Sequence, residues 1–274
     1  MSEVTFAEAV LVARDLLERH EKKLFRPRVG EGAGADITFL PSIDAMHGLL
    51  EAVCEDLVQT NGDIGDNEYS EIWDSLKKLE RSQGNPIYPL RPEDKCKQPI
   101  FVKLVPTSDR QLGAETIGIK PPILRRINPQ ARVFIITISN QMNYCHRRFA
   151  IAKELVHALT DVGDCTNLKN GQSQGLKSLL DAHGQLRRVP SSSDITSPDT
   201  VIHAEDFGLV AAKELLVPFR YRGTLKYFID NHMYSPKDLA LKFGVPAAII
   251  ESFCTPIGDL SAQVNRTYTT SDLR

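Results

Sequence analysis

The sequence predicts an α+β fold, in which an N-terminal helical region precedes a small mixed or antiparallel sheet and a C-terminal helical portion. Residues 1–85 and 202–254 carry apolar residues three and four positions apart, which is the period of helices with one buried face. Residues 100–139 contain short runs rich in β-branched residues, which is typical of strands. The order of these segments places the sheet between two helical parts.

Three apolar stripes predict the helices of the N-terminal region. Thr5 and Glu8 have the spacing of a capping box just before the first stripe, and Ser42 precedes the second. The second stripe stops at Asn61-Gly62, and the third ends near Gly84. The stripes consist of Phe6, Val10, Ala13, Leu16 and Leu17, then Ile43, Met46, Leu49, Leu50, Val53 and Leu57, then Ile72, Trp73, Leu76 and Leu79.

Proline, glycine and β-branched residues indicate where the elements after residue 85 begin and end. The stretch from Pro86 to Pro99 carries four prolines and is interpreted as a linker or an extended crossing. Strands are expected at 100–105, 116–119 and 133–139, and the last of these is the best strand in the chain. Helices are expected at 146–162, 202–217 and 224–231, followed by a helix, turn and helix over 235–254. Residues 163–200 form a long polar connection, and the last dozen residues are expected to fray.

Composition excludes several classes of protein. The net charge is -2, so no strong basic field favours direct binding of nucleic acid. Five scattered cysteines form no C-x-x-C pair, which argues against a disulfide framework and for a reducing compartment. The first residues do not have the pattern of a signal peptide, and no apolar run reaches membrane-spanning length. We therefore expect a cytoplasmic protein that is not in a membrane.

The strongest chemical signal lies on the helix expected at 146–162. Zincin peptidases carry H-E-x-x-H on a helix, where two histidines four apart bind zinc and the glutamate activates the metal-bound water. Here the pattern is K-E-x-x-H, formed by Lys153, Glu154 and His157. A protonated lysine has three donors and no acceptor, so it cannot ligate a metal. Taken alone, this pattern is typical of a solvated helix face.

The surrounding residues favour a zinc peptidase helix over a solvated helix face. The segment resembles the core helix of the ImmA/IrrE family of zinc metallopeptidases, which reads like R-F-T-x-A-H-E-x-G-H. The matching residues are Arg148, Phe149, Ala152, Glu154 and His157.

Two later segments extend the resemblance, which covers about residues 100–255 and not the N-terminal helices. Residues 205–218 are similar to the family's E-x-x-A-N-x-F-A-x-E-L-L-M-P signature, with Glu205 at the place of the third metal ligand. Leu209 and Ala211 depart from that signature, whereas Ala212, Glu214, Leu215, Leu216 and Pro218 match it. Residues 235–246 are similar to a helix-turn-helix-like segment of the family. The connection from His157 to Glu205 is longer than the family pattern.

The resemblance implies a small sheet packed on a zincin-type helix. It also implies that Glu154 is the general base and that His157 and Glu205 are metal ligands. With Lys153 at the first ligand position, these roles become vestigial. We therefore expect that the chain binds no cofactor, and that it binds zinc only if the site is active. One hypothesis is that the Lys153 ammonium replaces the metal charge and pairs with Glu205 or Glu154.

Three histidines are candidate replacements for the missing ligand. His203 and Glu205 are two apart, so on a helix they diverge by roughly 200°. His146 lies seven residues before Lys153, on the same face but roughly 10 Å away along the axis. His183, in the long connection, is the only one without such a constraint. For each of the three, a surface or capping histidine is the preferred interpretation.

Two further features receive plainer interpretations. Cys145 and Cys165 are interpreted as buried thiols, because no oxyanion loop or third partner accompanies His157. The second helix within 235–254 carries no arginine or lysine, although recognition helices need side chains that reach bases and phosphates. We therefore interpret this segment as a packing module.

The predicted organisation is an N-terminal helical region with a Pro-rich linker at 1–99, an ImmA/IrrE-like metallopeptidase-type domain at 100–258, and a tail at 259–274. Members of the family cut or bind helix-turn-helix repressors in mobile elements or stress responses. Our first hypothesis is a pseudopeptidase that binds such a transcriptional regulator. The alternatives are an active zinc endopeptidase that cleaves it and a DNA-associated regulator, so whether the chain is an enzyme stays open.

Overall fold

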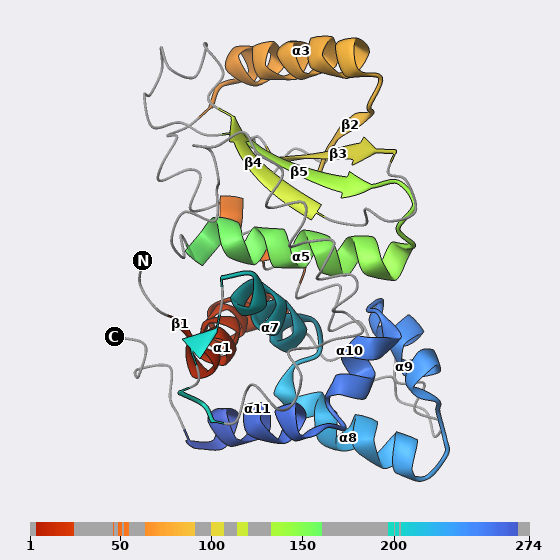
Figure 1. Cartoon of the computed structure of the whole chain (residues 1–274). Coiled ribbons are helices and arrows are strands. Elements are labelled where there is room, and N and C mark those ends of the chain that lie inside the picture. Colours follow the sequence, from red (N-terminus) through yellow and green to blue (C-terminus); the bar gives the residue numbers. More distant parts are fainter. Residues whose placement is uncertain are drawn as a thin grey trace. The chain divides into compact units, whose positions relative to one another are not determined.

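The computed structural model describes residues 4–24, 46, 49–50, 52–54, 64–90, 100–106, 114–119, 133–160, 197–199, 201–202 and 204–267. The fold is mixed α+β, as the sequence predicts, and is mostly helical (Figure 1). The chain divides into two compact units. The helical unit comprises Met1–Leu49, Tyr144–Val156 and Gln185–Arg274, and the sheet unit comprises Leu50–Asn143 and His157–Gly184.

The sheet unit contains a four-stranded mixed sheet with the order β2-β3-β5-β4. The central strands β3 and β5 are parallel, with Val102 opposite Ile136, while the β2–β3 and β4–β5 pairs are antiparallel. The expected strands at 100–105 and 133–139 are therefore confirmed. The strand expected at 116–119 begins two residues earlier, at Ala114. The strands are β2 (Ile87–Pro89), β3 (Ile100–Val105), β4 (Ala114–Ile119) and β5 (Val133–Ser139).

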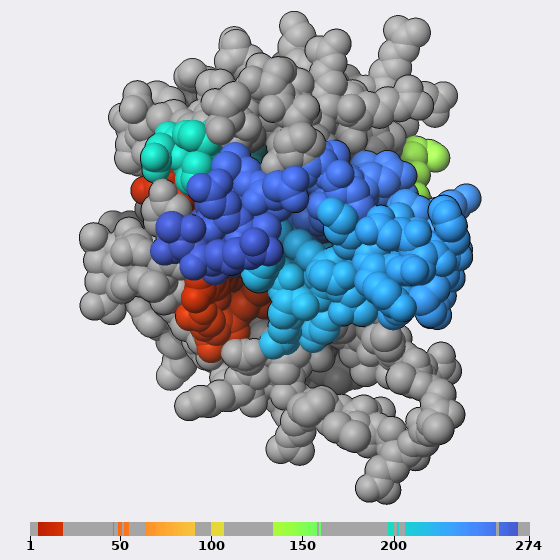
Figure 2. All heavy atoms as spheres, turned by 90° about the horizontal axis from the view of Figure 1, so that it is seen from below, coloured from red at the N-terminus to blue at the C-terminus, as the bar shows by residue number. Residues whose placement is uncertain are grey.

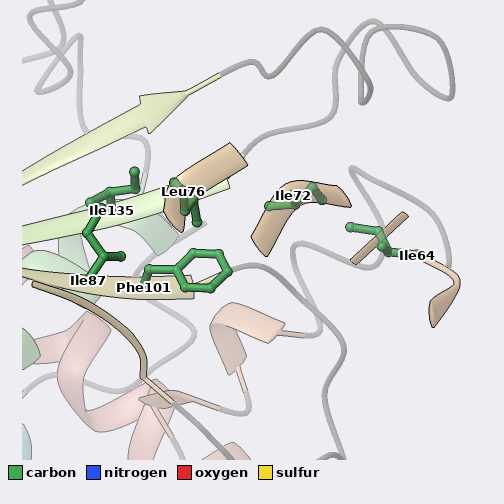
Figure 3. Close-up of a cluster of buried hydrophobic side chains, with 6 residues drawn as sticks. All are labelled: Ile64, Ile72, Leu76, Ile87, Phe101 and Ile135. Atoms are coloured by element: carbon green, nitrogen blue, oxygen red, sulfur yellow. The ribbon is translucent and has the colours of Figure 1, made fainter. Parts of the chain in front are cut away.

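The core of the sheet unit lies between the sheet and α3 (Asp66–Gln83). Tyr69 and Trp73 of α3 stack on Phe101 of β3, with ring centroids 6.2 and 5.7 Å away. Figure 3 shows the six buried residues of this cluster, which are Ile64, Ile72, Leu76, Ile87, Phe101 and Ile135. Strand β2 lies in the stretch interpreted as a linker or an extended crossing. Its Ile87 is buried, and the Ile87 amide donates to Glu80 of α3.

In the helical unit, the N-terminus pairs with a segment near residue 200. Strand β1 (Val4–Thr5) is antiparallel to β6 (Val201–Ile202), and the Ala7 amide donates to the Pro198 carbonyl. The predicted capping box is confirmed, since the Thr5 amide donates to Glu8 Oε2 at 2.6 Å and the Glu8 amide donates to Thr5 Oγ1 at 3.2 Å. Helices α1 (Phe6–Leu24) and α7 (Ala204–Leu216) then pack against each other.

Four further helices complete the helical unit. They are α8 (Phe219–Asp230), α9 (Pro236–Phe243), α10 (Ala247–Ser252) and α11 (Pro256–Thr267). Helix α9 is capped by Ser235 and ends at Gly244, which has a φ of 63°. Ile249 and Ile250 of α10 are buried, which agrees with the packing module expected over 235–254.

The organisation differs from the predicted boundaries in two places. The region predicted at 1–99 is divided, because α1 belongs to the helical unit and α3 to the sheet unit. The tail predicted from 259 is helical up to Thr267, with Ser261 and Val264 buried. Periodicity reveals a buried face but not the element that covers it, which is why these boundaries could not be read from sequence.

The cysteines and the helix lengths bear on the expected absence of a disulfide framework and of a membrane-spanning segment. Cys54 is bonded in a disulfide, whereas Cys145 and Cys254 are free thiols. The sequence argues against a disulfide framework but does not indicate this single bond, since spacing cannot show which cysteines the fold brings together. Among the described residues, no helix has both the length and the apolarity that a membrane crossing needs.

Candidate functional site

The predicted site residues Lys153, Glu154 and His157 lie on α5 (Tyr144–Thr160), which begins two residues before the expected start. All three are buried, with exposed fractions of 4, 6 and 9%. A solvated helix face, which the K-E-x-x-H pattern alone would favour, is therefore wrong for this helix. Charged side chains are rarely buried unless they are paired, so Lys153 and Glu154 need compensating partners.

Lys153 forms a buried ion pair within the motif. Its Nζ lies 3.5 Å from Oε1 of Glu154, and the two side chains are 6 and 7% exposed. The carboxylate compensates the ammonium in a place where an isolated charge would be very costly. Of the two partners expected for Lys153, the pairing with Glu154 is thus observed, while the side chain of Glu205 lies outside the described residues.

Lys153 and His157 lie on the same face of α5. Residues four apart share one face of a helix, so Lys153 and His157 lie one turn apart, as the two histidines of a zinc peptidase would. Glu205 lies in the first turn of α7. Within the described part of the chain, no group of three His, Cys, Asp or Glu side chains could hold a metal ion.

Of the three histidines that could replace the missing ligand, only His146 is among the described residues. His146 lies on the first turn of α5 and is half-buried. His183, His203 and Cys165 lie outside the described residues. Cys145 is a partly exposed free thiol at the start of α5 rather than the buried one expected.

Arg148, which belongs to the same motif, binds the end of another helix. Its Nη1 donates to the carbonyl oxygen of Phe243 at 2.7 Å and to that of Gly244 at 3.4 Å. Burial lowers the pKa of the Arg148 guanidinium. The carbonyls at the C-terminal end of a helix lack partners within the helix and attract a cation. Arg148 therefore joins the motif helix α5 to the C-terminal end of α9.

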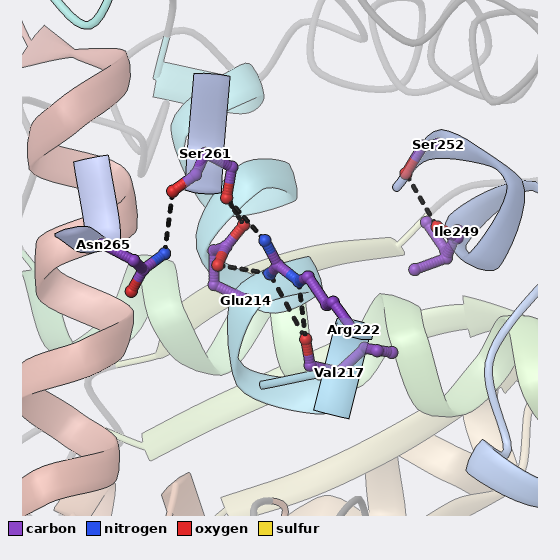
Figure 4. Close-up of polar contacts among 7 residues, drawn as sticks. All are labelled: Glu214, Val217, Arg222, Ile249, Ser252, Ser261 and Asn265. Carbon is purple, nitrogen blue, oxygen red and sulfur yellow. Dashed lines mark hydrogen bonds and ion pairs between the residues drawn. The ribbon is translucent and has the colours of Figure 1, made fainter. Parts of the chain in front are cut away.

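A second buried ion pair lies in the segment that resembles the later family signature. Glu214 of α7 pairs with Arg222 of α8, and the Ser261 hydroxyl of α11 donates to Glu214 Oε1 at 2.5 Å (Figure 4). Arg222 also donates to Ser261 Oγ at 2.7 Å and to the Val217 carbonyl at 3.3 Å. This network joins three helices, and Arg222 and Ser261 carry no sequence signal that could have identified them.

Lys213, next to this network, is also buried, with 4% of its surface exposed. Burial lowers its pKa to about 8, an effect that nearby Glu214 opposes and Arg222 reinforces. Its Nζ lies 5.5 Å from the centroid of the Phe253 ring, which gives the cation an aromatic neighbour. The sequence pattern did not single out this lysine.

A pocket of about 280 Å³ opens elsewhere in the helical unit, and none of the predicted site residues lines it. Its charged residues include Arg14 and Glu18, which form an ion pair at 2.7 Å, and Glu214, which Arg222 neutralises. The lining consists of Val10, Arg14, Leu17, Glu18, Glu214, Pro218, Phe219, Arg220 and Asn265.

No family model, no curated protein and no solved structure matches this chain. The resemblance to ImmA/IrrE peptidases therefore rests on the residues themselves. Those on α5, namely Arg148, Phe149, Ala152, Glu154 and His157, are all buried.

Proposed function

We propose that this chain is a pseudopeptidase of ImmA/IrrE type, which acts as a regulatory protein by binding a protein partner such as a helix-turn-helix transcriptional repressor. The observation that carries the proposal is the buried ion pair between Lys153 and Glu154, at 3.5 Å. By the resemblance, these two residues correspond to the first zinc ligand and the general base of such a peptidase.

The ion pair changes what the helix can do chemically. A buried ammonium repels a divalent cation and offers no lone pair to it. The Glu154 carboxylate is also engaged with Lys153 at 3.5 Å, which makes it less available to a water molecule. Both effects oppose hydrolysis by this helix and leave its scaffold available for binding alone.

The choice of partner follows from the resemblance. Family members act on helix-turn-helix repressors, so a relative that has lost the metal would keep a surface for such proteins. Binding without cleavage would sequester the repressor or protect it, which is regulation by mass action.

The test is the zinc content of the purified full chain after exhaustive dialysis. We would compare wild type with Lys153→His, with the double variant Lys153→His/His157→Ala, and with Lys78→His, which adds a histidine at an exposed position of α3. We expect no zinc in wild type or in the Lys78→His variant. About one zinc per chain is expected in Lys153→His, and less in the double variant, which lacks a ligand.

Two results would contradict the proposal. About one zinc per wild-type chain would favour the active endopeptidase. An empty Lys153→His variant with unchanged stability would show that Lys153 does not stand in for a ligand. A fluorescent helix-turn-helix repressor offered to wild type should be bound and remain uncut, whereas cleavage would again favour the peptidase.

A further inference from the structure

We propose that the disulfide at Cys54 is a reversible redox switch, which stabilises the sheet unit when it is formed and loosens that unit when a small thiol reduces it. The inference goes beyond the proposed function, because it concerns the sheet unit and needs neither a metal nor a protein partner. The effector belongs to the class of low-molecular-weight thiols, of which glutathione is an example.

The cysteines of the chain narrow the bond to two pairings. The chain has five cysteines, of which Cys145 and Cys254 are free thiols. The partner of Cys54 within the chain is therefore Cys96 or Cys165, both of which lie outside the described residues. Both positions belong to the sheet unit, as Cys54 does, so the bond closes a loop within that unit.

Either pairing encloses α3 in the closed loop. The two candidate loops, 55–95 and 55–164, both contain α3 and β2. Closing a loop removes conformations from the unfolded chain and so stabilises the folded one. The packing of α3 on the sheet, where the rings of Trp73 and Phe101 lie 5.7 Å apart, is therefore among the contacts that the bond helps to maintain.

Cys54 lies in a buried segment of the sheet unit. Ala52, Val53 and Cys54 are helical, with exposed fractions of 9, 1 and 7%. A thiolate has to reach a sulfur atom of a disulfide in order to break it, so burial slows the exchange until the segment opens locally. The state of the bond therefore follows lasting changes in the surrounding thiols and not brief ones.

Two observations favour a switch over a permanent staple. Cys145 is partly exposed and Cys254 is exposed, and both are free. A single bond beside free thiols is typical of a chain in a reducing environment, where disulfides are transient and often sense redox state. The sheet unit also has its own apolar core, the cluster around Phe101 in Figure 3, so it can stay folded after reduction.

The exchange balances with a small disulfide as the oxidant. One of the two cysteine thiolates attacks a sulfur of oxidised glutathione and releases the first glutathione thiol. The second cysteine thiolate attacks the protein sulfur of this mixed disulfide, forms the Cys54 bond and releases the second glutathione thiol. The two cysteines are oxidised, the glutathione disulfide is reduced, and the two cysteine protons leave with the glutathione. An excess of reduced glutathione reverses each step.

The first measurement follows the bond itself in the full chain. The protein is equilibrated with glutathione at several ratios of the reduced to the oxidised form and is then quenched with acid. Peptide mapping by mass spectrometry gives the fraction of Cys54 in the bond, which should fall from nearly all to nearly none across the series. One of the variants Cys96→Ser and Cys165→Ser should lose the bond entirely, and the other should keep it.

The second measurement follows the fluorescence of Trp73, the only tryptophan, which reports on the sheet unit. Reduction should lower the temperature of its unfolding transition by about 10 °C, the effect of losing the closure of a loop of this length. Cys54→Ala should melt near the reduced wild type, with or without reductant.

Cys254→Ser provides the matched control. It removes an exposed free thiol that follows α10 in the helical unit, whose helices α8 to α11 form the blue part of the surface in Figure 2. This variant should keep the Cys54 bond and respond to reductant as the wild type does. An equal loss of the response in Cys254→Ser and Cys54→Ala would show that the effect does not come from the bond.

Further outcomes would overturn the proposal. A Cys54 bond that persists in the largest excess of reduced glutathione would be a permanent staple, and one that never forms with oxidised glutathione would be no switch. Equal melting temperatures of the two states would show that the bond restrains nothing. Loss of the folded state on reduction, seen by circular dichroism at room temperature, would make the bond a requirement for folding. These outcomes do not depend on zinc content or on repressor binding, so the failures of the two proposals are distinguishable.

Discussion

Arg148 of α5 donates a hydrogen bond to the carbonyl oxygen of Phe243 at 2.7 Å, so the helix with the K-E-x-x-H motif is bound to the end of α9. The two residues are 95 positions apart in sequence. The bond lies in the interior and its donor is charged, so its loss would be costly for both elements. The order of the motif helix is thereby linked to that of α9.

Arg148→Met should lower the free energy of unfolding by about 2–4 kcal/mol, since it removes a buried, charge-assisted hydrogen bond. Urea unfolding followed by circular dichroism would measure the loss. Arg147→Met, at the neighbouring half-buried position, should lose less than about 1 kcal/mol. Equal losses in the two variants would show that the contact with Phe243 contributes nothing specific.

Gly244→Ala should be more destabilising than Gly84→Ala. Both glycines have a left-handed backbone, with φ of 63° and 68°, which costs any other residue about 1–2 kcal/mol. A Cβ at Gly244 would also lie 2.6 Å from Nη1 of Arg148, whereas nothing lies within 4 Å of one at Gly84. Trp73 is the only tryptophan and reports on the sheet unit, so its fluorescence follows Gly84→Ala while circular dichroism follows both variants. A smaller loss in Gly244→Ala would contradict the close approach.

Arg222→Met should cost about 3–5 kcal/mol, because it leaves the Glu214 carboxylate buried without its cation. The double variant Glu214→Leu/Arg222→Met should recover most of this loss, since a well-packed apolar pair often replaces a buried ion pair without cost. Chemical unfolding of the two single variants and the double variant gives the coupling energy. Additive losses would show that the two side chains do not act as a pair. The exposed Arg266 of α11 is the control, and its change to methionine should cost less than about 1 kcal/mol.

Lys213→Met should stabilise the protein at pH 7 by about 2–3 kcal/mol. The pKa of Lys213 is about 8 in the folded chain and 10.5 when unperturbed, so the unfolded state binds more protons between these values. Wild-type stability should therefore rise from pH 8 to about pH 10.5, and the advantage of the variant should shrink over the same window. Urea unfolding at several pH values measures both trends, and an advantage that does not change with pH would exclude a buried ammonium as the cause.

Local signals in the sequence predicted much of the fold. Thr5 and Glu8 form the capping box that their spacing predicts, and the β-branched run 133–139 is strand β5. Helix α8 was expected only from residue 224, after Gly223, yet it begins at Phe219. Gly223 is exposed, and a Cβ there would have open space around it, so the helix continues through the glycine at a small cost.

The site was predicted in part. The pattern of Lys153, Glu154 and His157 identified the helix, but it could not show that these polar residues are buried, because burial depends on elements far away in the chain. Arg222 and Ser261 were missed for the same reason, since they meet Glu214 from two other helices. The place of Glu205 relative to the motif stays a prediction, as does the packing of the sheet on α5.

The pairing of Val4 with Ile202 has a consequence for the synthesis of the protein. Ribosomes produce the N-terminus first, so α1 emerges long before α7, the helix against which it packs. During that interval the apolar residues of α1, which include Phe6, Val10 and Ala13, cannot pack against α7. Chaperones are expected to bind them while they are exposed. A nascent chain that stops short of Ala204 cannot assemble the helical unit, so ribosome-bound fragments of that length should be sensitive to proteases along α1.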